Sequence, residues 1–166
     1  MRASTIVAIA AGVAVAGVLA AKGMAMVTSS SAPAAFSGAC NTSLAGAADW
    51  TVEEGKRLGK SVGLVQRAVV SLKIPAVCAC THDALQSSVR AERWVLAGSL
   101  TGTSYKMTIA LRAKDATVRE HAREAAAADL QRLTAGQDVS LAEIGLMSRQ
   151  VDAALKSCFS KYMGRG

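Results

Sequence analysis

A stretch without charge, residues 5–21, most constrains where this chain can go and what it can fold into. It consists almost entirely of Ala, Gly, Val, Ile and Leu, with Arg2 before it and Lys22 after it. A short apolar core behind a positive N-terminus is typical of an export signal or a single membrane anchor. Because Arg2 and the terminal amine outweigh Lys22, we expect the rest of the chain to lie outside the cytoplasm.

The fate of this segment has more than one reading. Its 17 uncharged residues are at the lower limit for a spanning helix, which needs roughly 17–25. Small residues suited to signal cleavage end at Ala20 and again at Ala34. An acid-free leader rich in Ser and Ala is also typical of organelle transit peptides. The sequence therefore predicts a periplasmic or membrane-anchored protein and leaves organelle targeting as the alternative.

The bulk composition suits one small basic domain. The 166 residues carry 19 Lys and Arg against 12 Asp and Glu, a net charge of +7. No run of Lys and Arg with interleaved aromatic residues occurs, so we expect no nucleic-acid partner. Aromatic residues make up only 4% of the chain, which predicts a core of Ala, Val, Leu and Met.

Composition and periodicity divide the chain into four parts. Residues 1–23 are the signal peptide or transmembrane anchor. Residues 24–48, rich in Ser, Ala, Thr and Gly, read as a flexible linker. Residues 49–163 form a single domain, and residues 164–166 a frayed tail.

Within the domain, periodicity predicts a mixed fold. Helical spacing covers 49–73, where Pro75 is expected to stop the helix, and again 115–135 and 140–162. A short apolar run at 74–80 reads as a strand. The segments 93–99 and 104–112 read as a β-hairpin, since the second alternates apolar and polar residues. The predicted fold class is α+β: a small antiparallel sheet (strand plus hairpin) covered by about three helices, preceded by the N-terminal apolar helix.

The first predicted helix carries two further patterns. Gly55, Gly59 and Gly63 recur at four-residue spacing, which would allow another helix to approach closely. On a different side of the same helix, a basic face is expected. It consists of Lys56, Lys60 and Arg67.

The four cysteines give the most specific chemical expectation. An even number of cysteines behind an export leader predicts two disulfides among Cys40, Cys78, Cys80 and Cys158. On a strand, Cys78 and Cys80 would project to one side, each able to bond a different partner. Three pairings are open. The alternative is a metal or thiol-redox centre at Cys78, Cys80 and His82, since thiolates and imidazole suit zinc or copper.

No catalytic or cofactor signature is present, so we predict neither catalytic residues nor a cofactor. The absence of such a signature favours a protein that is not an enzyme. The leading interpretation is a cell-envelope protein that works through protein contacts, as an assembly, scaffold or accessory subunit. Its expected partners are other envelope or membrane proteins, including a second copy, and the membrane through the N-terminal segment. The alternative function is a periplasmic thiol-redox or metal-binding protein centred on Cys78, Cys80 and His82.

Overall fold

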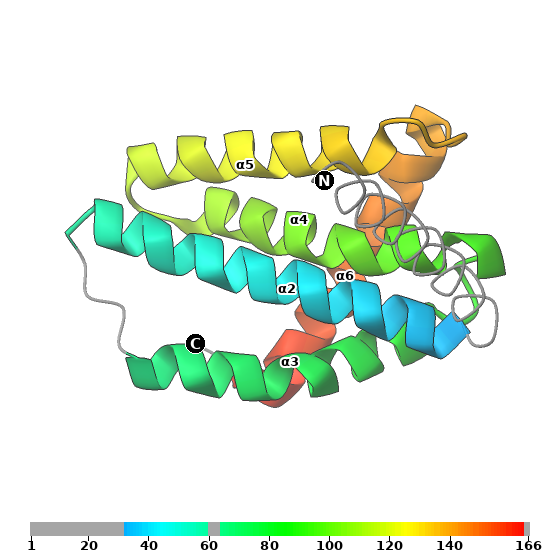
Figure 1. Ribbon diagram of the computed structural model, residues 1–166, viewed down its shortest axis with the longest axis horizontal. Coiled ribbons are helices and arrows are strands. Elements are labelled where there is room, and N and C mark those ends of the chain that lie inside the picture. The colour runs from blue at the N-terminus through cyan, green and yellow to red at the C-terminus, as the bar shows by residue number, and fades with distance from the viewer. Residues whose placement is uncertain (1–31, 60–63, 165–166) are drawn as a thin grey trace, which may run out of the picture.

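The computed structural model describes residues 32–59 and 64–164, and 86% of that part of the chain is helical. Five α-helices and one 3-10 turn follow one another along these residues (Figure 1). Their bounds are α2 (Ala32–Arg57), α3 (Leu64–Leu85), η1 (Ala91–Arg93), α4 (Trp94–Arg112), α5 (Ala116–Thr134) and α6 (Leu141–Met163).

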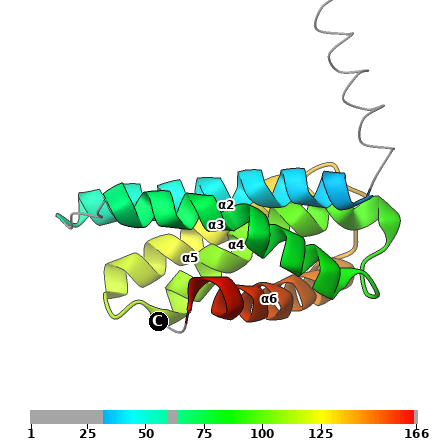
Figure 2. The same cartoon turned by 90° about the horizontal axis from the view of Figure 1, so that it is seen from below.

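Four of the helices surround the core and the fifth lies outside it. Helix α2 packs against α3 and α4, and α6 packs against the other sides of α3 and α4. The apolar cluster draws its buried side chains from these four helices, including Phe36, Val77, Leu100 and Val151. Helix α5 contacts α4 and buries only Ala122 and Ala126. Figure 2, seen from below, shows α6 beneath α3 and α4.

Two glycines of α4 set the distance between α4 and α2. A Cβ placed on Gly98 would lie 2.6 Å from the Phe36 carbonyl oxygen, and one on Gly102 would lie 2.5 Å from the Ser43 carbonyl oxygen. Ser43 Oγ donates to the Ser99 carbonyl (2.5 Å) and accepts from the Gly102 amide (3.0 Å). Small residues four apart allow such backbone proximity, and the two helices run parallel here.

Two disulfides fasten α3 to the helices on either side of it. Cys40 of α2 bonds to Cys78, and Cys80 bonds to Cys158 of α6. Residues two apart on a helix point in roughly opposite directions, at about 100° per residue. Cys78 and Cys80 therefore reach two different helices. The predicted disulfides are thus present. In the chain-entropy model, closing the 78-residue separation contributes up to about 4.5 kcal/mol.

The predicted α+β class is wrong, because residues 32–59 and 64–164 contain no strand. The run 74–80 lies within α3, and the two hairpin arms lie within α4 except for Arg93, the last residue of η1. The alternation in the second arm would expose Lys106 and bury Leu111, but on α4 Lys106 is buried and Leu111 is 68% exposed. The hairpin turn expected at residues 98–103 is also helical, and the cost of Gly98 and Gly102 in a helix is offset by the contact with α2.

Two boundaries also differ from the prediction. Residues 32–48 were expected in the flexible linker but form most of α2, with Phe36, Cys40 and Leu44 in the core; residues 24–31 lie outside the described part. The small residues of 32–48, typical of linkers in a sequence, here allow close contacts between helices. Helix α3 continues through Pro75, whose exposed position leaves the released carbonyl on the solvent side.

The last two helices begin where the sequence predicts, and a capping side chain marks each start. Asp115 accepts hydrogen bonds from the Thr117 and Val118 amides at the start of α5. Ser140 accepts one from the Glu143 amide (3.1 Å) at the start of α6. Beyond α5, Gly136 takes a φ of +72°, the left-handed conformation expected of a glycine after a helix.

The predicted signal or anchor at residues 1–23 lies outside the described residues. Among the helices of 32–59 and 64–164, none combines the length and apolar character that crossing a bilayer requires.

We predict that Gly98→Ala lowers the free energy of unfolding by about 2 kcal/mol, because the new methyl group forces α2 and α4 apart. Gly46→Ala is the matched control: its Cβ meets nothing within 4 Å, so the change should stabilise α2 by up to about 1 kcal/mol. Urea denaturation followed by circular dichroism measures both. Equal behaviour of the two variants would contradict the close contact.

An ion-pair cluster holds the start of α6 to the turn before α4. Glu143 accepts hydrogen bonds from Arg90 Nη2 (2.6 Å) and Arg93 Nε (3.0 Å). Arg93 Nη2 also donates to the Asp138 carbonyl (2.8 Å). The hydrogen bond from Arg90, with the further hydrogen bond and charge of Arg93, lowers the pKa of Glu143 below its ordinary value.

A lowered folded-state pKa means that Glu143 stabilises the fold above its ordinary pKa of 4.5 and loses this contribution as the pH falls through the folded-state value. We therefore predict that Glu143→Gln flattens the acid side of the stability curve, measured as urea midpoints from about pH 6 to about pH 2. Glu124→Gln, at an exposed position on α5, is the control and should leave that slope unchanged.

Candidate binding groove

Helices α2 and α5 both lie on α4 and diverge from each other along it. They run antiparallel and come together where α2 ends and α5 begins, and they separate toward the start of α2 (Figure 1). The space between them is a groove with a cavity volume of about 810 Å³. This volume lies within the range of about 300–1,000 Å³ that is usual for ligand sites.

The floor of the groove consists of small side chains. Helix α2 lines it from Ala34 to Ala47, a length of about 20 Å at about 1.5 Å per residue. Val95 and Ser99 of α4 line the wide end, and Val95 is 50% exposed. Leu133, next to Arg132, lines the α5 side of the groove. The α2 residues that line the groove are Ala34, Ala35, Gly38, Ala39, Thr42, Ser43, Gly46 and Ala47.

Three charged side chains stand at the narrow end. Lys106 of α4 is only 8% exposed, and its Nζ donates to Asp129 Oδ2 of α5 at 2.6 Å. Arg132, one turn further along α5, pairs with the other oxygen of Asp129. The Lys106 Nζ also lies 5.9 Å from the centre of the Trp50 ring on α2. Two cations share one carboxylate, so this end of the groove has a net positive charge.

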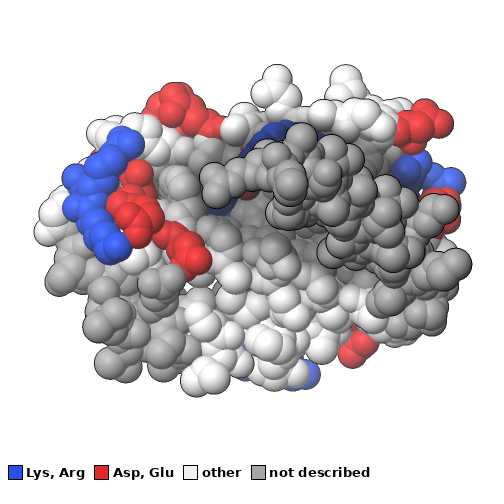
Figure 3. All heavy atoms as spheres, in the orientation of Figure 1, with Lys and Arg blue, Asp and Glu red and all other residues white. Residues whose placement is uncertain are grey.

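A polar bridge closes the space beyond these residues. The buried Glu54 of α2 accepts a hydrogen bond from His121 Nδ1 of α5 at 2.7 Å, and Arg57 Nη2 lies 2.8 Å from His121 Nε2. This bridge joins α2 to α5 two turns beyond Ala47. Figure 3 shows acidic and basic side chains gathered at the end of this face where α2 ends.

Tyr105, beside Lys106 on α4, contributes no charge to the narrow end. Burial raises the pKa of Tyr105 above its ordinary value of 10, and a hydrogen bond with Thr51 only partly opposes this. Its ring packs against Phe159 with the ring centroids 5.6 Å apart. The phenol is therefore neutral at physiological pH and acts as a packed side chain.

The residues proposed for metal or redox chemistry are engaged elsewhere. Cys78 and Cys80 are both disulfide-bonded, so neither sulfur is a thiolate in this structure. His82 is buried with its ring between Trp94 (4.8 Å between centroids) and Phe36 (5.6 Å). Among the residues that the structure describes, no group of three His, Cys, Asp or Glu side chains is placed to hold a metal ion.

The expected glycine stripe does not lie along one helix. Gly55 is in the last turn of α2, Gly59 follows its end with a φ of +68°, and Gly63 lies outside the described residues. A Cβ on Gly59 would meet nothing within 4 Å, so no described helix approaches it closely. The helix expected over 49–73 is thus two helices, and close glycine packing occurs instead at Gly98 and Gly102.

The expected basic face is described only at its first residue. Lys56 is exposed and pairs with Glu53 at 2.7 Å. Lys60 and the side chain of Arg67 lie outside the described part of the chain. Sequence reasoning missed the charged end of the groove, because Lys106, Asp129 and Arg132 sit on helices whose contact it did not foresee.

Comparison with known proteins adds no family: no family model, curated protein or solved structure matches this chain.

We predict that Asp129→Asn destabilises the protein by about 2 kcal/mol, because it leaves the buried Lys106 ammonium without its carboxylate. Adding Lys106→Met to Asp129→Asn should restore most of this loss, since the double variant buries no unpaired charge. Thermal or urea unfolding of the two variants and the parent measures the coupling. Additive losses would contradict a coupled pair.

Proposed function

We propose that this chain is an exported, non-enzymatic helical protein that works by binding a helix of another envelope protein in the groove between α2 and α5. The single observation that carries the proposal is the small-residue floor of that groove, which no residue of 32–59 or 64–164 covers. The roles that fit are those of an assembly factor, scaffold or accessory subunit.

Two glycines in the floor have no explanation inside the described structure. Gly38 and Gly46 lie within α2, where each costs about 1 kcal/mol relative to Ala. A Cβ on either would meet nothing within 4 Å. The glycines of α4, in contrast, are each pressed against α2. A second helix that approaches α2 from the groove side would use Gly38 and Gly46 as α2 uses Gly98 and Gly102.

The chemistry of the groove favours a helix over a small apolar ligand. Small-molecule sites are lined mainly by large hydrophobic and aromatic side chains, whereas this floor is Ala, Gly, Ser and Thr. Small residues at helical spacing along about 20 Å are what close helix–helix contacts require. The positively charged narrow end adds charge complementarity for an occupant with an acidic end.

Export is supported by the disulfides and by the leader. Structural disulfides persist in oxidising compartments, and the four cysteines here form two disulfides. The uncharged segment at residues 5–21 is the part of the sequence that would act as the export signal.

A photo-cross-linking amino acid at Val95 tests the binding function in the native envelope. We expect one product, mapped by mass spectrometry to a helical segment of an identified envelope protein. Filling the floor with Gly38→Leu and Gly46→Leu should abolish that product without loss of stability, because a Cβ at either position meets nothing within 4 Å and Leu has a higher helix propensity than Gly.

The matched control places the same cross-linker at Ala153, an exposed position on α6 across the molecule from the groove. A product that forms equally at both positions, or that persists in the filled variant, would refute the groove as the binding site.

A further inference from the structure

The narrow end of the groove holds hydrogen-bond donors that no described residue of the chain engages. The Lys106 ammonium has three donors, is 8% exposed and lines the groove. Its polar contacts are one hydrogen bond to Asp129 and the face of the Trp50 ring. A nearly buried ammonium with two spare donors is costly unless an acceptor reaches it.

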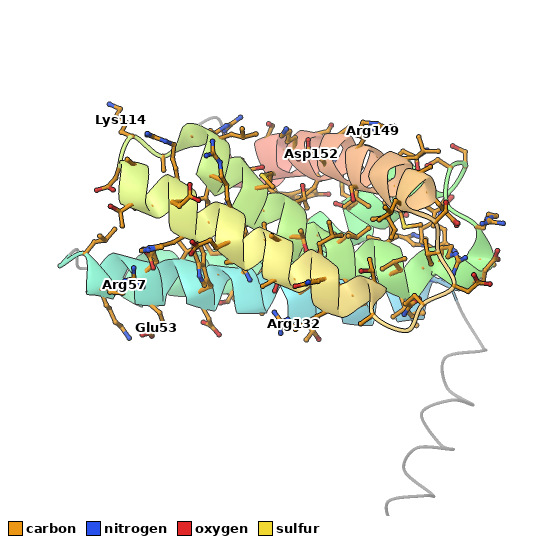
Figure 4. All side chains as sticks on the ribbon, turned by 90° about the horizontal axis from the view of Figure 1, so that it is seen from above. Glu53, Arg57, Lys114, Arg132, Arg149 and Asp152 are labelled. Carbon is orange, nitrogen blue, oxygen red and sulfur yellow. A yellow bond between two sulfur atoms is a disulfide. The ribbon has the colours of Figure 1, made fainter. Side chains whose placement is uncertain are left out.

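Arg132 supplies a second set of donors to the same place. Only its Nη2 contacts Asp129, and the guanidinium carries five N–H groups. Figure 4 shows Arg132 on the side of the molecule where Glu53 and Arg57 of α2 lie, and Arg149 and Asp152 of α6 on the opposite side. The remaining donors of Arg132 and Lys106 therefore border one space, whose net charge is positive.

The shape of the groove decides which acceptor can arrive. No described residue closes its wide end, beside Ala34 and Val95, and beyond its narrow end the Glu54–His121 bridge joins the two walls. A helix that enters from the wide end cannot continue past this bridge. The end of a helix that enters first must carry the acceptors, and a helix C-terminus presents unpaired carbonyls and the negative end of its dipole.

We propose that the groove binds the helical C-terminus of a partner chain, with the free terminal carboxylate on Lys106 and Arg132. The partner helix would then run parallel to α2 and antiparallel to α5, over about four turns. This inference rests on the proposed function and adds to it the identity of the recognised end and the direction of the helix.

A pair of synthetic peptides tests the inference. Both are the same 16-residue Ala- and Leu-based helix with a fluorescent label at the N-terminus, one with a free C-terminal carboxylate and one with a C-terminal amide. We expect the acid to bind saturably by fluorescence anisotropy and the amide to bind about tenfold more weakly, the effect of one charge-assisted contact.

Variants of the full chain assign the effect to residues. Arg132→Gln should clearly reduce the difference between acid and amide, because the cation that remains, Lys106, is balanced by the charge of Asp129. Arg149→Gln, which removes the same charge from exposed α6, should leave the difference intact. A preserved difference in Arg132→Gln would overturn the assignment.

The outcomes separate this inference from the proposed function. If both peptides bind equally and the Gly38→Leu and Gly46→Leu variant binds neither, the groove function stands and the carboxylate inference fails. If neither peptide binds, the carboxylate inference is overturned, and the Val95 cross-link decides the groove function separately. If hexadecanoate binds while the acid peptide does not, the groove takes an aliphatic carboxylate, and both proposals are overturned.

Discussion

The close approach of α2 to α4 is the contact on which the rest of the structure depends. Because Gly98 and Gly102 have no side chains, the two backbones meet, and Ser43 bonds to α4 on both its donor and acceptor sides. This contact fixes the direction of α2 on α4 and so places its small outer face beside α5. The groove is thus a consequence of where α2 is held, and the floor of the groove cannot shift without disturbing the core.

The two disulfides fix the positions of α3 and α6 relative to α2. A core with few aromatic residues buries little apolar area per side chain, so small domains of this kind gain from covalent links. Here α3 carries a cysteine of each disulfide: Cys78 bonds to α2, and Cys80 bonds to α6. Together with the glycine contact, they leave α5 as the one described helix that is held mainly by its contacts with α4.

Helices with strong local signals could be predicted from the sequence, whereas a helix whose formation depends on packing could not. Asp115, Ser140 and Gly136 mark helix ends through local hydrogen bonds and backbone conformation, and these ends were predictable. Helical spacing in α6 correctly predicts Ile144, Val151, Leu155 and Cys158 as buried. It also predicts Leu141, which is 88% exposed. In α4, however, residues with strand and turn preferences are helical. The reason is the contact with α2, far away in the sequence, which Gly98 and Gly102 allow because they have no side chains. Two cysteines were recognised as reaching two partners, although for a strand rather than a helix.

A fixed floor beside an adjustable wall has a consequence for recognition. Helix α5 buries only Ala122 and Ala126, and polar links from Asp129 and His121 hold it in place. Because α5 contributes only these two fully buried side chains, a small shift of α5 disturbs the core less than a shift of α2 does. In the proposed function, α5 would therefore adapt to the side chains of the bound helix, whereas the α2 floor, held by the α2–α4 contact, would keep its shape. Selectivity would then depend mainly on α2 and on the charged end of the groove.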